Sequence, residues 1–575
     1  MRPDPHSYAD AAQPQTQSID LDLRADFQNQ VLHGEITLRF RSPGGGPFDL
    51  DTRDLQIQSV ASLEGAPLPF TLAAPEPILG SRLRVDLPHG SRGLRIRYRT
   101  SPQATALQWL APSQTAGDQP FLYSQSQPIH ARSLAPLQDT PRIRVSVGSA
   151  RFTVPARLRT LMAAAPRGRE PAGAEAVDLF EMPQPIPPYL LAFAVGDLVQ
   201  RPLSPRSAVW AEPAVADAAA HELAGVEAMM LAAERLFGPY EWDRYDVLVM
   251  PRSFPYGGME NPRLTFVTPS ILAGDRSLVN VIAHELAHAW TGNLVTNASA
   301  DDFWLNEGFT VYAERRILEA LEGRESAEMH AAAGLHELRT ALDRFAAHPE
   351  RTRLRNDLRG VDPDEAYSTV PYEKGYLLLR KLEETAGRAA WDGFLREYLA
   401  AFRFQSIVTQ QFLDFLEERL PGLAGRAGAL EYIDGPGLPP SAPLPRSRRL
   451  EQLRTGAAEP ANPTELLVLL QSIAPGAARL REMDARWGLS SRRSLELRHT
   501  FVVLQLRAGV EGAVEAARQL LLATGRMKYL RPLYTELLRR DRAAAERIFA
   551  EARGGYHNIA RAVVEGLLKG DPPKG

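Results

Sequence analysis

The stretch VIAHELAHAW, residues 281–290, decides how the chain is interpreted, because it places His284 and His288 four residues apart with Glu285 between them. Four residues make about one helical turn, so on a helix both imidazoles lie on one face and can reach one ion. The alternative is a pair of core histidines satisfied by backbone carbonyls. A third ligand distinguishes these interpretations, because a catalytic zinc site uses three protein ligands and leaves one position for water.

A third candidate ligand lies in DFWLNEGFTVYAERR (302–316), where Glu307 follows His288 by 19 positions. The pattern of this segment is helical enough to present the carboxylate to the same ion. We therefore predict one Zn²⁺ site per chain, held by His284, His288 and Glu307. Glu285 is then the candidate general base for a water whose pKa the ion lowers. A solvated helix carboxylate is the alternative for Glu285.

Composition narrows the chemistry. With 575 residues the chain exceeds one hydrophobic core, so about three domains are expected. The net charge of -3 gives no polyanion-binding signature, and we expect no nucleic-acid partner. The chain has no cysteine, which excludes disulfides, thiolate zinc sites and cysteine nucleophiles. Any metal ligand must be His, Asp or Glu.

Targeting signals are not evident in the sequence. The first twenty residues have neither the positively charged region nor the apolar region of a signal peptide. Nowhere do 18 apolar residues run together. We expect a cytoplasmic protein without membrane association. We also expect a monomer, while the sequence leaves an oligomer open.

Hydrophobic patterning divides the chain into three domains and a linker. Residues 1–197 alternate apolar and polar side chains, as at Ile19, Leu21 and Leu23, which predicts antiparallel sheet. Residues 198–434 are mainly helical in pattern, although YDVLVM (245–250) and RLTFVT (263–268) are typical of strands.

The last part of the chain follows a proline-rich linker, GPGLPPSAPLPRS, at residues 435–447. Residues 448–575 contain several amphipathic segments, which predict stacked helices. No fixed sequence period accompanies them, so a helical-repeat superhelix is a hypothesis. The predicted class is multidomain α+β.

Motifs along nearly the whole chain resemble one family. HELAH, eighteen residues and the glutamate of NEG, preceded by GGMEN (257–261), resemble the gluzincin zinc aminopeptidases of the M1 family. SQSQPIHARSLAPLQDTP (124–141), DPDEAYSTVPYEKG (362–375) and GRMKYLRPLY (525–534) are similar to its leukotriene A4 hydrolase and aminopeptidase B branch. The resemblance implies an N-terminal β-sheet domain, a thermolysin-like catalytic domain and a helical C-terminal domain.

The resemblance also implies roles for residues of the GGMEN motif. Gly257 and Gly258 would lie on a sheet edge and let a substrate backbone approach as an added strand. Glu260 would bind the free α-amino group of a peptide, which would make the enzyme an exopeptidase. Tyr256 would line the same substrate site. An ordinary loop carboxylate is the alternative for Glu260.

Other substrate-site roles follow from the same resemblance. Gln125 would share the amino-group site, and Gln127 would lie nearer the side-chain pocket. Tyr372 would donate its hydroxyl to the oxyanion of the tetrahedral intermediate. Asp364 and Tyr367 would line the pocket. The alternatives are sheet-surface glutamines, a buried structural tyrosine, and packing or helix-capping roles for the last two.

Arg526 and Lys528 form a separate candidate site. Only five of the 66 basic residues are lysine, which suggests a GC-rich bacterial genome and makes this lysine worth noting. The resemblance implies that the pair binds the C-terminal carboxylate of short peptides. A solvated cation pair at a helix start is the alternative.

Two positions add detail to the zinc motif. Phe309 stands where many relatives carry histidine, so local packing is expected to differ while the ligands remain. Glu314, two helical turns after Glu307, is a candidate partner for a ligand histidine.

Together these features predict a zinc aminopeptidase that removes the N-terminal residue from di- and tripeptides. One alternative is epoxide hydrolysis of a lipid at the same site, to which Asp364, Gln127 and Tyr367 would contribute. The other is a peptide-binding scaffold without catalysis.

Overall fold

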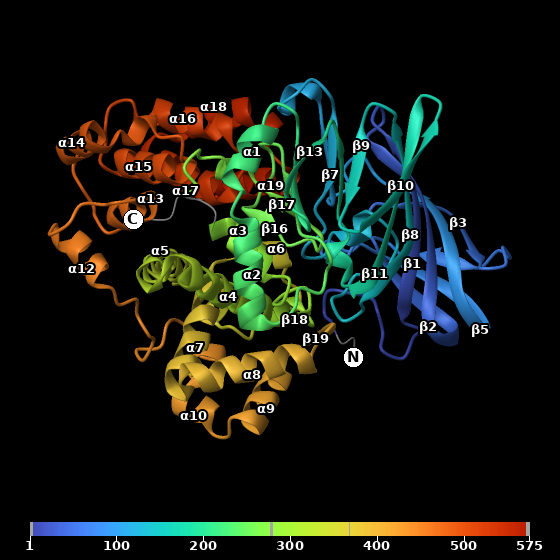
Figure 1. Ribbon diagram of the computed structural model, residues 1–575. Coiled ribbons are helices and arrows are strands. Elements are labelled where there is room, and N and C mark those ends of the chain that lie inside the picture. Colours follow the sequence, from blue (N-terminus) through green and yellow to red (C-terminus); the bar gives the residue numbers. More distant parts are fainter. Residues whose placement is uncertain (1–3, 277–279, 367, 571–575) are drawn as a thin grey trace.

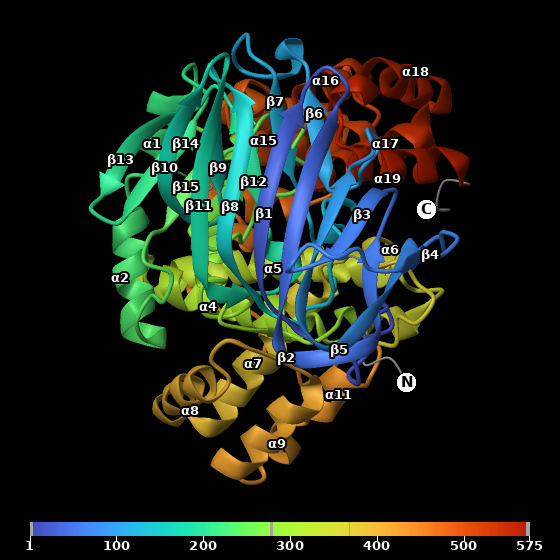
Figure 2. The same ribbon diagram turned by 90° about the vertical axis from the view of Figure 1, so that its right-hand side faces the viewer.

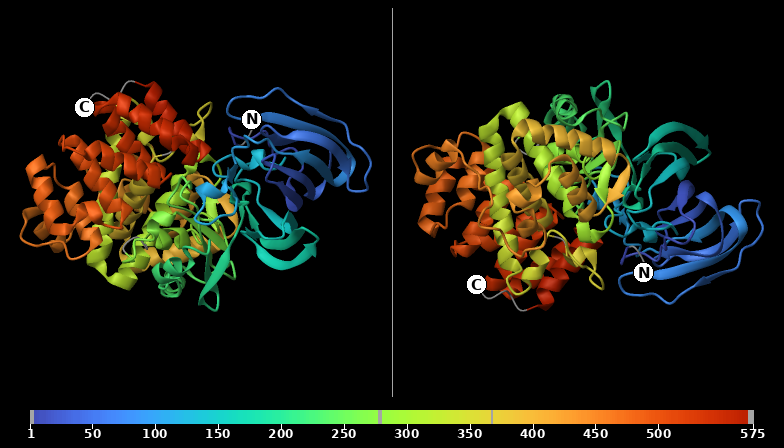
Figure 3. Two further views of the ribbon diagram at one scale, coloured as in Figure 1. Left: turned by 90° about the horizontal axis from the view of Figure 1, so that it is seen from above. Right: turned by 90° about the horizontal axis from the view of Figure 1, so that it is seen from below.

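The computed structural model describes residues 4–276, 280–366 and 368–570. Two sheets of the N-terminal domain lie on one side of the molecule, the catalytic domain occupies the centre, and the C-terminal helices cover another side (Figure 1). Views from above and below also place the catalytic domain between the other two (Figure 3). This arrangement confirms the predicted α+β class and domain order.

The N-terminal domain consists of two sheets. The larger has the strand order β10-β11-β8-β1-β2-β5-β3, with β4 also paired to β5, and its long strands lie side by side in Figure 2. The smaller has the order β6-β7-β12-β9. The strands are β1 (Thr16–Asp26), β2 (Val31–Thr52), β3 (Gln56–Ser62), β4 (Phe70–Leu72), β5 (Ser81–Arg99), β6 (Leu107–Leu110), β7 (Phe121–Ser124), β8 (Val145–Pro155), β9 (Arg159–Met162), β10 (Ala165–Ala172), β11 (Glu175–Ile186) and β12 (Phe193–Gly196).

Alternation of apolar residues predicted these strands because every second side chain enters the core. Ile19, Leu21 and Leu23 of β1 are all buried as expected. One pairing differs from the prediction of an antiparallel sheet, since β1 and β8 run parallel. Side-chain alternation is the same in both arrangements, so periodicity could not reveal this pairing.

The catalytic domain begins with a five-stranded sheet in the order β13-β14-β15-β17-β16. Its strands are β13 (Val199–Ser204), β14 (Ser207–Ala211), β15 (Asp246–Val249), β16 (Gly258–Met259) and β17 (Leu264–Val267). The strands predicted at 245–250 and 263–268 are confirmed as β15 and β17. β16 pairs antiparallel with β17 and ends the sheet, so the GGMEN motif lies on an edge strand.

Helices and one short strand pair complete this domain. Strand β18 (Val295–Asn297) pairs parallel with β19 (Gln405–Ile407). The helices are α1 (Ala216–Glu222), α2 (Val226–Phe237), α3 (Asn280–Ala287), α4 (Trp304–Glu322), α5 (Arg324–Arg344), α6 (Pro363–Ala366), α7 (Val370–Ala386), α8 (Arg388–Ala401), α9 (Thr409–Arg419), α10 (Leu423–Ala427) and α11 (Ala429–Ile433). The N-terminal and catalytic domains share one continuous hydrophobic core.

Residues 435–447, all of them described, form neither helix nor strand. The domain boundaries that we propose from the sequence fall between elements, since β12 ends at Gly196, β13 begins at Val199 and the first C-terminal helix begins at Arg448. The C-terminal helices are α12 (Arg448–Thr455), α13 (Pro463–Gln471), α14 (Ala477–Trp487), α15 (Leu495–Arg507), α16 (Ala513–Ala523), α17 (Met527–Arg540), α18 (Arg542–Ala552) and α19 (Asn558–Lys569).

In the described part of the chain, no helix is both long and apolar enough to cross a membrane.

Candidate metal centre and substrate-binding residues

The three predicted zinc ligands converge on one point. Nε2 of His284 lies 3.2 Å from Nε2 of His288, and Oε2 of Glu307 lies 3.3 Å and 3.5 Å from these two nitrogens. Tetrahedral ligands about 2.0–2.1 Å from a zinc ion are about 3.3–3.4 Å apart, so the triangle has the size that zinc requires. Oε2 of Glu307 is buried and has no hydrogen-bond partner among the described residues, as expected for an atom that serves a metal.

The outer nitrogens of both histidines are fixed by hydrogen bonds. Nδ1 of His284 donates to Oε2 of Glu314 at 3.2 Å, which is the contact expected for Glu314. Nδ1 of His288 donates to the carbonyl of Thr291 at 3.0 Å. Because both Nδ1 atoms carry the proton, both Nε2 lone pairs are free to bind zinc. The donor set therefore fits this metal.

Two helices carry the ligands. Helix α3 ends at Ala287, and the amide of His288 continues its pattern by donating to the His284 carbonyl at 3.2 Å. Glu307 lies in the first turn of α4. Phe309, two residues after Glu307, is buried in an aromatic cluster, and its ring stacks on that of Tyr398 with centroids 5.1 Å apart. This side chain therefore belongs to the packing around α4.

Glu285 lies beside the ligands and against the edge strand. It is 6% exposed, and burial raises the pKa of its carboxyl well above the ordinary value. A Cβ on Gly258 would lie 2.2 Å from Oε1 of Glu285. Only glycine at this position leaves room for the carboxylate, and α3 and β16 lie next to each other in Figure 1.

Glu260 follows β16 and is buried at the other end of the motif. Nε2 of Gln127 donates to its Oε1 at 3.2 Å, while Asn293 donates to its backbone carbonyl at 2.7 Å. Burial, with the charge of Glu307 nearby, raises the pKa of Glu260. A cation beside this carboxylate would favour its charged form.

The two glutamines differ from the expected arrangement. We expected Gln125 beside Glu260, but the glutamine that contacts Glu260 is Gln127. Gln125 donates to Sδ of Met259 at 3.2 Å, and its Oε1 is buried without a partner in the described structure. Both glutamines follow the end of β7 and reach neighbouring residues, Met259 and Glu260, so the sequence could not rank them by distance from Glu260.

Tyr372 stands over the metal centre. Its ring stacks on His284 with centroids 6.0 Å apart, and its side chain hydrogen-bonds to Glu307. Tyr256 packs edge-on against Phe254 at 6.1 Å. Tyr367, the remaining predicted pocket residue, lies outside the described residues.

Asp364 has a partner that sequence reasoning missed. Nε2 of the buried His130 lies 2.9 Å from Oδ2 of Asp364, and Nδ1 of His130 lies 2.9 Å from Oγ1 of Thr105. The side chain of Asp364 remains 27% exposed. His130 belongs to the same SQSQPIH segment as both glutamines. Its closeness in sequence to two candidate site residues was the one feature that could have indicated a role for it.

Arg526 and Lys528 lie at the start of α17. Arg526 is 7% exposed, and its Nη2 lies 2.7 Å from the position of a Cβ on Gly257. Nη1 of Arg526 donates to the hydroxyls of Tyr529 at 3.0 Å and Ser270 at 3.3 Å. The C-terminal domain thus brings a buried cation to the residue next to Gly258.

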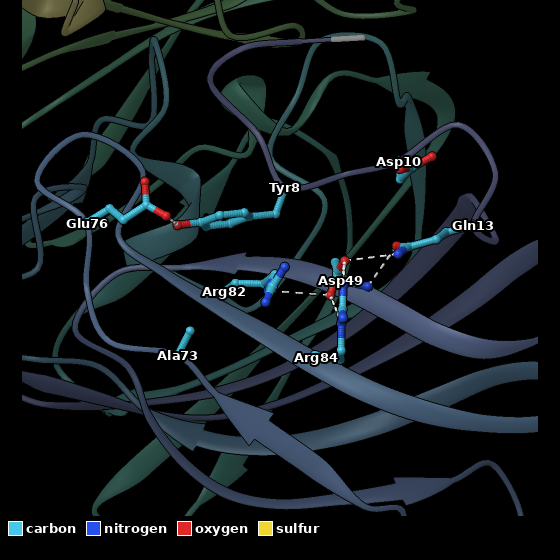
Figure 4. A pocket seen from close by; sticks show the side chains of 8 residues that line it. All are labelled: Tyr8, Asp10, Gln13, Asp49, Ala73, Glu76, Arg82 and Arg84. Atoms are coloured by element: carbon cyan, nitrogen blue, oxygen red, sulfur yellow. Dashed lines mark hydrogen bonds and ion pairs between the residues drawn. The ribbon is translucent and has the colours of Figure 1, made fainter. Parts of the chain in front are cut away.

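A separate hollow of about 310 Å³ lies in the N-terminal domain, far along the chain from these motifs (Figure 4). Two of its lining carboxylates already have partners, since Arg84 makes two bonds of 2.7 Å to Asp49 and Tyr8 donates to Glu76 at 2.8 Å. The described residues that line it include no histidine and none of the predicted site residues. We therefore assign the chemistry to the metal centre.

Comparison with known proteins agrees with this geometry. Residues 221–427, which contain all three ligands, match the model of the peptidase family M1 domain. Leukotriene A-4 hydrolase of Xenopus laevis is 36% identical over 98% of this chain and 98% of its own length. The chain belongs to peptidase family M1. As a member of this family it is a zinc-dependent peptidase.

Further comparisons place this M1 peptidase more narrowly. Residues 462–568 match the leukotriene A4 hydrolase C-terminal model. Leucine aminopeptidase 2 of Aspergillus niger is 36% identical and covers 95% of this chain and 94% of its own. The structure of yeast LTA4 hydrolase in complex with bestatin matches with a TM-score of 0.92 and 32% identity, over 98% of this chain and 97% of that chain.

Proposed function

We propose that this M1 peptidase is an aminopeptidase that removes the N-terminal residue from di- and tripeptides. One observation carries the proposal: three groups follow one another along the edge strand. Glu260 stands at one end, Glu285 touches the position of Gly258, and Arg526 touches that of Gly257. Three residues of extended chain span about 10 Å, so both charged ends of a short peptide can be bound while its first peptide bond faces Glu285.

The amino end of the substrate is bound by Glu260. A buried carboxylate needs a positively charged partner, and the ammonium group at the amino end of a peptide supplies one. An interior peptide nitrogen carries no charge and cannot form this pair. Gln127, which contacts Glu260, offers a carbonyl oxygen to the same ammonium. This pairing restricts cleavage to the first peptide bond.

His284, His288 and Glu307 would hold a zinc ion, which would supply Lewis-acid polarisation of the first carbonyl and a lowered pKa for water. Glu285 accepts a proton from the attacking water and then donates it to the leaving amine. Tyr372 donates its hydroxyl to the oxygen that becomes negative. Arg526 binds the C-terminal carboxylate, with Lys528 beside it.

The test is release of the N-terminal residue from tripeptides, free and N-acetylated, with and without a zinc chelator. Glu285→Gln keeps the size of the side chain but cannot accept the proton, so kcat should fall by about 10²–10⁴-fold. Cleavage of free peptides only, lost on chelation and in the variant, is the expected result. A zinc-loaded protein that binds peptides but cleaves none would favour the scaffold alternative.

Epoxide hydrolysis is a second candidate, favoured by the similarity to Xenopus leukotriene A-4 hydrolase and by the position of Asp364. Asp364 keeps one face exposed while His130 holds its Oδ2. Turnover of a fatty-acid epoxide that is abolished by Asp364→Asn, while peptidase activity persists, would support it. If the protein turned over no fatty-acid epoxide at any lipid concentration, epoxide hydrolysis would be rejected as a function.

A further inference from the structure

Lys528 is held between two carboxylates that come from two domains. Its Nζ lies 2.9 Å from Oε1 of Glu337 and 2.9 Å from Oε1 of Glu496. Glu337 belongs to α5 of the catalytic domain, and Glu496 belongs to α15 of the C-terminal domain. An ammonium has three N–H donors, so two of them are used before any substrate arrives.

Arg526 has a different environment. Its Nη1 donates only to neutral hydroxyls, those of Tyr529 and Ser270, and its buried Nε has no partner among the described residues. The guanidinium therefore retains donors for an anionic ligand. The two cations of the candidate carboxylate site therefore differ. Lys528 is already paired with carboxylates, whereas Arg526 retains N–H donors for an anionic ligand.

The two acidic partners of Lys528 also differ. Glu496 is 7% exposed, accepts a further hydrogen bond from Tyr529 at 3.0 Å, and is part of the packing of the C-terminal domain. The side chain of Glu337 is 31% exposed and bonds to Lys528 from the opposite domain. With both carboxylates present, the charges of Arg526, Lys528, Glu337 and Glu496 cancel.

We propose that Glu337 is a specificity-determining residue that limits the preference of the enzyme for peptides with a free C-terminal carboxylate. It does so by occupying a donor of Lys528 and by cancelling one positive charge of the site. This inference rests on the proposed function, in which Arg526 and Lys528 bind the peptide carboxylate. The substrate class concerned is short peptides, divided into C-terminal acids and C-terminal amides.

The experiment compares kcat/KM for a tripeptide and for its C-terminal amide, on the zinc-loaded full chain. In Glu337→Gln the acid-to-amide ratio should rise about fivefold, through a lower KM for the acid. Glu337→Asp keeps the charge but shortens the side chain, so the ratio should rise less. Glu350→Gln, which removes a charge from a side chain that is 56% exposed, should leave the ratio unchanged.

Coupling to Lys528 is tested in the same assay. In a Lys528→Met background, Glu337→Gln should change the ratio less, because the donor that Glu337 occupies is absent and only its charge near Arg526 remains. An unchanged or lower ratio in Glu337→Gln would overturn the inference, and so would an equal rise in Glu350→Gln. If the unaltered enzyme does not distinguish acid from amide, and Arg526→Ala does not change that, the proposed carboxylate site itself fails.

Discussion

Gly308 of helix α4 and Gly375 of helix α7 meet backbone to backbone. A Cβ on Gly308 would lie 2.8 Å from Cα of Gly375, and a Cβ on Gly375 would lie 2.7 Å from Cα of Gly308. Helix α4 carries the ligand Glu307 and α7 carries Tyr372, each close in sequence to its glycine. The contact therefore sets the distance between the metal centre and the proposed oxyanion donor.

Gly308→Ala or Gly375→Ala should separate these helices. Overpacking of this kind costs about 1–3 kcal/mol, and the displacement of Tyr372 from Glu307 should lower kcat by about 10²-fold. Thermal melting and steady-state kinetics measure the two effects. Gly393→Ala is the control, because nothing lies within 4 Å of its Cβ position in α8, and it should stabilise the protein by about 0.5–1 kcal/mol. Full activity in both contact variants would contradict the positioning role.

The neighbouring glycines of the edge strand should give different kinetic defects. Gly258→Ala places a Cβ within 2.5 Å of three atoms of Glu285, so kcat should fall about 10²-fold or more. Gly257→Ala meets Nη2 of Arg526 at 2.7 Å, at the end of a longer side chain. We expect that variant to raise KM for free tripeptides severalfold and to change kcat little. Identical defects in both variants would argue against separate contacts.

The zinc ligands could be predicted from sequence because a helix fixes the spacing of His284 and His288, and the NEG segment was helical in pattern. The strands of the N-terminal sheets were predictable from alternation, which reports burial. Neither pattern reports which strands pair, so the parallel pair β1–β8 was missed. The sequence spacing of ligands is therefore enough to predict a metal site when the ligands lie on one or two helices.

Contacts between distant segments were less predictable. His130 meets Asp364 across 234 positions, and Lys528 meets Glu337 across the junction of two domains. The approach of a substrate backbone to the glycines of GGMEN stays a prediction, and the structure adds that their missing Cβ atoms leave space for Glu285 and Arg526. Such partners depend on tertiary packing, which no single motif contains.

Glu314 should control zinc affinity through His284. Its carboxylate holds the Nδ1 proton at 3.2 Å, and loss of such a partner weakens metal binding about 10–100-fold. Glu314→Ala should show this loss in competition with a chelator. Glu314→Gln keeps an acceptor oxygen and should lose less. Equal affinity in all three proteins would mean that His284 is oriented by its packing alone.

Acid should destabilise the C-terminal domain through His499. Burial lowers the pKa of this side chain to about 4 from the ordinary 6.5, and its Nε2 has no partner in the described structure. Between these values the unfolded chain binds a proton that the folded chain does not, so stability falls as pH falls from 6.5 to 4 and levels off below 4. The full loss is on the order of 3 kcal/mol.

Urea unfolding at pH 7 and pH 5 tests this dependence, comparing the unaltered protein with His499→Phe. The variant should lose much less stability between the two values. His348→Gln is the control, because that side chain is 63% exposed. Glu496 does not interfere, since its pKa is lowered to about 2 by Lys528 and Arg526 against the cost of burial. Its stabilisation is lost only below about pH 4.5, as the unfolded carboxyl begins to bind protons. An unchanged pH dependence in His499→Phe would assign the acid sensitivity to other groups.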